Sequence, residues 1–200
     1  MSKLPLKYYL QDDVVALARD LIGKELVTCF DGLHTSGIIS ETEAYNGIVD
    51  KASHAYNNRR TARTEIMFGK GGVAYVYLCY GIHSLFNVVT NVEGTPHAIL
   101  IRGVIPKQGV DVMLKRRDKK KLDKTLSSGP GTVAMALGIH YSNSGLSLSG
   151  NQVWIEKGIK IPDNDIEITP RIGVDYAKQD ALLPYRFLWK KSGSIVFKSR

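Results

Sequence analysis

The chain contains the stretch Ile38-Ile39-Ser40-Glu41-Thr42-Glu43-Ala44-Tyr45, an apolar strand that ends in two acidic residues and an aromatic one. Side chains alternate along a strand, so Glu41, Glu43 and Tyr45 are predicted to share one face. Carboxylates beside an aromatic ring suit a flat, electron-poor or cationic ring, and they can activate a water next to it. The stretch therefore predicts a site at the end of this strand.

The segments before this stretch predict a helix followed by a hairpin. Residues 25–30 and 33–45 read as two strands, and Asp31-Gly32 between them is a hairpin turn signal. A helix capped by Asp12 and closed by Gly23 is expected ahead of them. Its apolar residues recur at helical spacing: Val14, Val15, Leu17, Ala18, Leu21 and Ile22.

A second strand further along carries three tyrosines and ends at a glycine: Tyr75-Val76-Tyr77-Leu78-Cys79-Tyr80-Gly81. Tyr75 and Tyr77 share a face, whereas Tyr80 has the opposite parity and sits at the turn with Gly81. Tyr77 can therefore line a pocket while Tyr80 projects from a hairpin tip, and Tyr75 is expected in the core. An antiparallel meander is predicted from strands over 73–80, 85–92 and 97–104, with turns at Gly81 and Glu93-Gly94.

The rest of the chain predicts a functional loop and several short elements. Residues 46–72 are polar and basic, and a loop of this length is rarely idle. Short helices are expected over 109–117 and 128–137, the second with Pro130 in its first turn. Further strands are expected over 153–156, 171–174, 186–189 and 194–197. Without a repeat or a composition break, residues 1–200 are predicted to form a single α+β domain.

The chain is basic, with 27 Lys and Arg against 19 Asp and Glu, a formal charge of +8 and a pI near 9.4. This charge favours a polyanionic partner, nucleic acid first and an anionic membrane surface second. The basic run Lys115-Arg116-Arg117-Asp118-Lys119-Lys120-Lys121 is interpreted as a solvated face.

Cysteine usage and hydropathy predict a cytoplasmic protein without a metal or a cofactor. Cys29 and Cys79 lie on separate predicted strands, and neither zinc-ligand spacing nor a disulfide framework is present. Residues 1–5 lack an apolar signal core. No apolar run approaches the roughly 20 residues that a membrane span needs, so no membrane association is expected.

Several segments spread over nearly the whole chain belong together: Glu41-Thr42-Glu43-Ala44-Tyr45, Ala52-Ser53-His54, residues 59–63, Met67-Phe68, the tyrosine strand with Gly81, Asn87, Leu100-Ile101-Arg102, Ser128-Gly129-Pro130, Arg171-Ile172-Gly173-Val174 and Pro184-Tyr185-Arg186-Phe187. In their order and spacing they resemble the alkyladenine (3-methyladenine) DNA glycosylase family. The resemblance implies a curved antiparallel β-sheet flanked by a few helices, with a β-hairpin protruding toward DNA, similar to the formyltransferase C-terminal-domain-like fold.

The family resemblance implies a monofunctional DNA glycosylase of base excision repair. It would flip alkylated purines out of double-stranded DNA, 3-methyladenine first, and leave an abasic site. Glu43 would be the general base, and Arg102 would hold the catalytic water or the backbone beside it. The pocket for the flipped base would be formed by Tyr45, His54, Tyr77 and Asn87, with Asn87 discriminating against the guanine amino group. A monomer is expected, and the range beyond 3-methyladenine (7-methylguanine, hypoxanthine, ethenoadenine) stays open.

The same resemblance implies a DNA-contacting surface around Tyr80, which would intercalate into the space that the flipped base vacates. The other DNA-binding positions are Arg59, Thr61, Arg63, Ile82, His83 and Ser128. One of them departs from the family pattern, because His83 stands where a tyrosine is common.

The predicted cleavage of a glycosidic bond requires a carboxylate and aromatic side chains. Breaking a glycosidic bond passes through an oxocarbenium-like sugar, which a carboxylate can stabilise while it also activates water. Extruding a base costs a few kcal/mol, and stacking on aromatic rings returns about 1–3 kcal/mol per base. A cationic methylated ring is expected to gain more from Tyr45 and Tyr77 through cation–π attraction.

Simpler interpretations stand beside this one. Glu43 and Arg102 could form a structural ion pair, and the tyrosines could be sheet-packing residues. One rival function is a non-catalytic nucleic-acid-binding module of the same fold. Another is a small-molecule hydrolase or group-transfer enzyme that uses Glu43 and His54, which predicts turnover without DNA.

Overall fold

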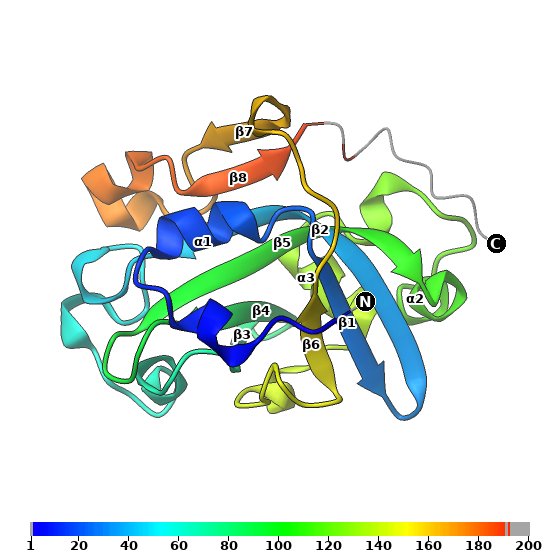
Figure 1. The fold of residues 1–200 in the computed structure, drawn as a ribbon, viewed down its shortest axis with the longest axis horizontal. Helices are drawn as coiled ribbons and strands as arrows, with labels where there is room; N and C mark the ends of the chain where they lie inside the picture. Colours follow the sequence, from blue (N-terminus) through cyan, green and yellow to red (C-terminus); the bar gives the residue numbers. More distant parts are fainter. Residues whose placement is uncertain (1, 191, 193–200) are drawn as a thin grey trace.

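The computed structural model describes residues 2–190 and 192, and its strands join one antiparallel sheet of eight strands (Figure 1). The order along the sheet is β3-β4-β5-β2-β1-β6, while β8 pairs with both β2 and β7. The strands are β1 (Glu25–Phe30), β2 (Leu33–Tyr45), β3 (Ala74–Cys79), β4 (His83–Thr90), β5 (His97–Gln108), β6 (Val153–Glu156), β7 (Ile166–Thr169) and β8 (Arg186–Trp189).

Three α-helices pack on this sheet: α1 (Val14–Asp20), α2 (Val110–Arg116) and α3 (Pro130–Leu137). The first was predicted with the wrong cap. Asp13, not Asp12, accepts hydrogen bonds from the backbone N–H groups of Val15 and Ala16. Asp13 directly precedes the first helical residue, which places its carboxylate within reach of these unpaired donors. The curved antiparallel α+β architecture expected from the sequence is confirmed. Within the described residues, no helix has the length and apolarity to cross a membrane.

The long strand β2 organises the sheet. Its first part pairs with β1 through the predicted turn, where Asp31 and Gly32 have φ values of 53° and 73°. Its last part pairs with β8 on the same edge, and β5 pairs along the other edge. Register shifts between β2 and β5 mark bulges around Glu41, and bulges bend a strand. The acidic end of β2 therefore lies in the interior of a curved sheet.

The strand pairing corrects part of the predicted meander. β3, β4 and β5 form a meander as expected, but β5 then pairs with β2, which precedes all three in the chain. No strand forms at 171–174, because the φ of 72° at Gly173 takes the backbone out of the extended region. The strand β7 at Ile166–Thr169 was missed. The predicted strand at 194–197 lies outside the described residues.

The two faces of the sheet have different roles. One face carries the main hydrophobic core, which includes Val88, Ile99 and Ile101 together with residues of α1 and α3. The hydroxyl of Thr42 donates to the carbonyl of Ala18 in α1, which fixes β2 against this core. Residues of the opposite parity, such as Glu43, face away from these helices. Core packing on one side thereby leaves the other side free to build a site.

Candidate active site

A row of directly paired residues crosses four strands on the face opposite the helices. Tyr75 on β3 pairs with Asn87 on β4, Asn87 pairs with Leu100 on β5, and Leu100 pairs with Glu43 on β2. Directly opposite residues on neighbouring strands share a face. The pairing therefore brings two distant segments, around Glu43 and around Tyr75, to one surface of the sheet.

Glu43 is fully buried and holds three donors. Its Oε1 accepts the backbone N–H of Ile172 at 2.8 Å, and its Oε2 accepts the hydroxyl of Tyr45 at 2.9 Å and Nη1 of Arg102 at 3.4 Å. Burial raises the pKa of the Glu43 carboxyl above its ordinary value, while Arg102 and the other two donors oppose that rise. A carboxylate with a raised pKa and a lone pair left on Oε1 is suited to accept a proton.

Arg102 bridges the two carboxylates at the end of β2. Its Nε donates to Oε1 of Glu41 at 3.0 Å, and Nε of Arg186 donates to the same oxygen at 2.6 Å. Glu41, Glu43 and Tyr45 lie on one side of β2, as strand alternation predicts, since Tyr45 reaches Glu43 directly. Glu41 thus balances the two arginines and leaves Glu43 with a single, longer arginine contact.

Arg171 is a site residue that the sequence pattern predicted as part of a strand. Its side chain is fully buried and forms a two-pronged pair with Asp50, through Nη1 at 2.5 Å and Nη2 at 2.9 Å. Its guanidinium also lies over the ring of Tyr45, 4.9 Å from the centroid. The pair fixes the backbone next to Arg171, and this backbone supplies the Ile172 N–H to Glu43.

A small aromatic cavity of about 30 Å³ lies next to Tyr45, whose hydroxyl donates to Glu43. Such a volume holds a water or two but no purine. The lining residues include the predicted Tyr45, His54, Tyr77 and Asn87, together with Ala52, Met67, Tyr75, Ala98 and Tyr176. Tyr75 was expected only in the core. It is buried in a hydrophobic cluster but also lines the cavity, and its hydroxyl lies 2.9 Å from Nδ1 of His54.

Asn87 is oriented by the backbone of the sheet. Its Nδ2 donates to the carbonyls of Tyr75 and Leu85, at 3.1 and 3.3 Å. Because two carbonyl acceptors fix the amino group there, the amide oxygen remains as the acceptor available to another group. Asn87 is buried and lines the cavity, so it can read the edge of a ring that enters.

Arg63 lies against the aromatic wall of the cavity. Its guanidinium is 4.7 Å from the centroid of the Tyr77 ring, and its Nη2 is 2.7 Å from Nε2 of His54. Burial, followed by the charges of Arg63 and Arg59, lowers the pKa of His54 to about 4. The imidazole is therefore neutral at neutral pH.

The tip of the β3–β4 hairpin is exposed and apolar. Tyr80 is 92% exposed with a φ of 51°, and Ile82 is 71% exposed. A positive φ is unfavourable for a bulky side chain. The predicted strands differ slightly here, because β3 ends at Cys79 and β4 already begins at His83. Tyr80 thus lies in the turn itself and projects from the sheet.

The remaining predicted DNA-binding residues lie around this hairpin and on the loop at 46–72. Arg59 and Thr61 are exposed, and Thr61 also takes part in a local turn with Thr64. His83 lies against α3, where a side chain on Gly131 would come within 3.1 Å of its ring. Ser128 is exposed and bridges to Gly103, next to Arg102 on β5.

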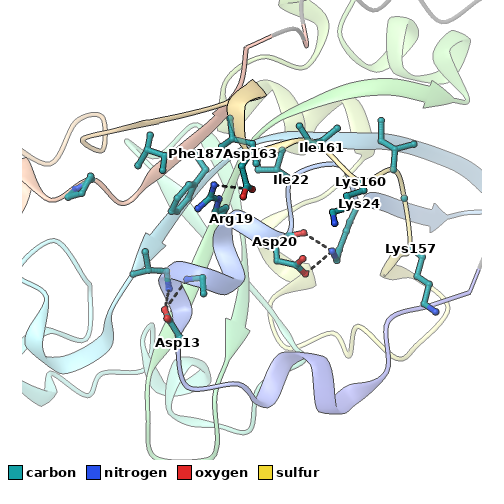
Figure 2. Close-up of a pocket in the computed structure, with 17 residues that line it drawn as sticks. Asp13, Arg19, Asp20, Ile22, Lys24, Lys157, Lys160, Ile161, Asp163 and Phe187 are labelled. Atoms are coloured by element: carbon teal, nitrogen blue, oxygen red, sulfur yellow. Dashed lines mark hydrogen bonds and ion pairs between the residues drawn. The ribbon is translucent and has the colours of Figure 1, made fainter.

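A larger hollow, of about 690 Å³, lies elsewhere, between α1, residues 157–163 and β8 (Figure 2). Its carboxylates already have partners, as Figure 2 shows: Asp20 pairs with Lys24, and Asp163 pairs with Arg19. It touches α1, which packs on the core face of the sheet, whereas Glu43 faces the opposite side. Among the described residues, no cluster of three or more His, Cys, Asp or Glu could hold a metal.

Comparison with known proteins identifies the class that this fold and site belong to. Residues 8–193 match the family described as methylpurine-DNA glycosylase (MPG). A relative from Chlamydia felis is 48% identical over 96% of this chain and 100% of its own length. Relatives from Bacillus cytotoxicus and Desulfitobacterium hafniense are 43% and 39% identical, over 96% and 99% of this chain and 98% and 100% of their own. All three bear the name "Putative 3-methyladenine DNA glycosylase".

The chain therefore belongs to the methylpurine-DNA glycosylase family. The family that the sequence motifs indicated is confirmed, and with it the expectation of a hydrolase of the N-glycosylase class.

Replacing Asp50 with Asn tests the scaffold behind Tyr45. The change leaves the buried charge of Arg171 unpaired, so the free energy of unfolding is expected to fall by about 3–5 kcal/mol, as measured by urea denaturation. Glu65→Gln is the matched control, because Glu65 pairs with Arg60 at the exposed surface of the loop, and it is expected to leave the midpoint unchanged. Equal shifts for both variants would contradict the structural role of the Asp50–Arg171 pair.

Proposed function

We propose that this protein removes alkylated purines, above all 3-methyladenine, from double-stranded DNA by hydrolysis of the N-glycosidic bond. The observation that carries the proposal is Glu43, a fully buried carboxylate held by three donors, one of which, the hydroxyl of Tyr45, belongs to a side chain that lines the aromatic cavity. The names of the relatives and the basic charge of the chain support a DNA substrate. One exposed wedge, Tyr80, fits a monomer that acts on one lesion at a time.

Glu43 acts as the general base. Tyr45, Arg102 and the Ile172 N–H fix its carboxylate in one orientation, so little reorganisation is needed during the reaction. The attacking water gives a proton to the carboxylate as its oxygen bonds to the sugar carbon, and the electron pair of the broken bond stays on the base. The product is an abasic site with an intact strand, since the mechanism uses no amine nucleophile.

The damaged base enters the cavity between the aromatic side chains. Because the free cavity holds only about 30 Å³, side chains at its mouth must move first. Tyr176 is 63% exposed and held by one hydrogen bond to the Ala52 carbonyl, which makes it the simplest part to displace. The amide of Asn87 sets which purine edge fits and disfavours the guanine amino group.

The exposed hairpin supports extrusion of the base. Tyr80 fills the space left in the duplex, with Ile82 beside it, while Arg59, Thr61, Arg63, His83 and Ser128 contact the DNA around the lesion. The positive φ of Tyr80 lowers the stability of the folded protein. Backbone strain of this kind concentrates at functional sites. The exposure and the strain of Tyr80 together favour a role outside the protein core.

Glu43→Gln tests the proposed function directly. Gln keeps the shape but cannot accept the proton, so single-turnover release of 3-methyladenine from methylated duplex DNA is expected to fall by about 10²–10⁴-fold, while affinity for the damaged duplex is retained. Released bases are separated by chromatography. Glu167→Gln, an exposed carboxylate on β7, is the matched control. Unchanged release by Glu43→Gln would remove the assigned base, and no release by wild type would refute the proposed function.

The pH dependence of base release follows from the raised pKa of Glu43. The base form is lost as pH falls through this raised pKa, so the rate is expected to decline from a higher pH than an ordinary glutamate, with a pKa of about 4.3, would give. Methylated duplex DNA with 3-methyladenine as the released base is suitable, because its methylated ring stays cationic over this range. An acid limb at the ordinary glutamate value, with DNA binding constant over the range, would contradict the assignment.

Tyr80→Ala tests the wedge. Loss of one stacked ring is expected to weaken binding of a duplex that contains an abasic site by about tenfold, measured by fluorescence anisotropy. Binding of single-stranded DNA serves as the internal control, because it offers no vacated space and is expected to stay the same. Equal affinity of wild type and variant for the abasic duplex would rule the wedge out.

A further inference from the structure

Arg102, Arg186 and Arg171 each pair with a carboxylate at the site: Arg102 with Glu41 and Glu43, Arg186 with Glu41, and Arg171 with Asp50. Arg63 differs, because among the described residues its guanidinium contacts the uncharged groups of His54, Tyr75 and Tyr77. Within residues 2–190, none of the ion pairs involves Arg63. One positive charge is thus left uncompensated at the aromatic wall.

Arg63 lies behind this wall and not inside the cavity. It lines a neighbouring groove together with Tyr77, and Tyr77 also lines the small cavity. The ring of Tyr77, 4.7 Å from the guanidinium, therefore separates the charge from a base held in the cavity. The side chain is exposed and contacts neutral groups only, in contrast to Arg171 behind Tyr45, which Asp50 neutralises.

The hydrogen bonding and the pKa of His54 are consistent with a positive electrostatic potential around Arg63. Arg63 offers only hydrogen-bond donors, so a ring nitrogen of His54 must accept from Nη2, at 2.7 Å from Nε2. The imidazole then cannot be doubly protonated. The lowered pKa of His54, which is caused by burial first and by Arg63 next, agrees with this geometry.

We propose that the positive charge of Arg63 determines the rate and the specificity of base release. Acting through the Tyr77 ring, this charge favours the departure of the base. When the N-glycosidic bond breaks, its electron pair moves to the base nitrogen and the sugar carbon becomes cationic. Water then adds to that carbon and gives its proton to Glu43. The base becomes less positive in this step whichever purine it is, so a positive charge beside it stabilises the transition state relative to the bound state.

The inference rests on the proposed function and changes one expectation about it. A cationic alkylated base was expected to gain from cation–π attraction to Tyr45 and Tyr77. One protein cation already lies against each of these rings. The uncompensated charge of Arg63 weakens binding of a cationic base and speeds its release. Part of the binding energy of a cationic lesion is thereby converted into rate.

Two replacements of Arg63 separate charge from shape. Arg63→Gln keeps a planar donor group but removes the charge, and Arg63→Lys keeps the charge without the planar group. Arg60→Gln is the matched control, because Arg60 lies in the same loop over the ring of Phe68 but is paired with Glu65. The probe is methylated duplex DNA, assayed for release of 3-methyladenine under single-turnover conditions at saturating protein.

Arg63→Gln is expected to lower the saturated rate of base release by about tenfold. It is also expected to increase the preference for the methylated duplex over the unmodified duplex in competition binding, a ratio in which lost phosphate contacts cancel. Arg63→Lys is expected to lose less of the saturated rate than Arg63→Gln, and Arg60→Gln is expected to release the base at nearly the wild-type saturated rate.

Two results would overturn the inference. An unchanged saturated rate in Arg63→Gln would exclude the electrostatic role, and an equal loss in Arg63→Lys would assign the effect to shape. Absence of 3-methyladenine release by wild type would instead refute the proposed function itself, so the two failures can be told apart.

Discussion

The burial of one carboxylate constrains the whole site. Glu43 lies on the central strand β2, is fully enclosed, and receives donors from three separate segments: Tyr45 on the same strand, Arg102 on β5 and the backbone of Ile172. A buried carboxylate without partners would be too costly to keep ionised. The donors make its burial tolerable, while desolvation still raises its pKa. Much of the surrounding structure, including the buried pair of Arg171 with Asp50, holds these donors in place.

The two-faced sheet explains how a compact chain provides both a core and a site. Residues of one parity pack with α1 and α3, and residues of the other parity form the row from Tyr75 to Glu43. The site is therefore built on paired strands of the sheet. The parts of the site that have to move are the exposed side chains at its rim. The free cavity is too small for a purine, so the proposed function requires exposed side chains at the rim to move before a base enters.

Local patterns in the sequence predict the elements whose structure depends on neighbours in the chain. The strands 25–30 and 33–45 and the turn at Asp31-Gly32 form as predicted, because alternation and turn chemistry are local. The family motifs also indicate most side chains that line the cavity. Long-range partners are different. Arg171 pairs with Asp50 across 121 residues, and its motif marks the segment as part of the family pattern but gives no sign of this partner. Likewise, only the structure distinguishes Arg63, which has no carboxylate partner among the described residues, from Arg60, which pairs with Glu65.

The ionisation state of Glu43 in the free protein tests the central claim most directly. Carbon-13 NMR of the side-chain carboxyl, assigned by comparison with Glu43→Gln, reports it without DNA or turnover. The account predicts a carboxylate at neutral pH that titrates above the ordinary value of about 4.3, as expected for a buried base held by three donors. A carboxyl that is already protonated at neutral pH, or one that titrates like an exposed glutamate, would contradict it.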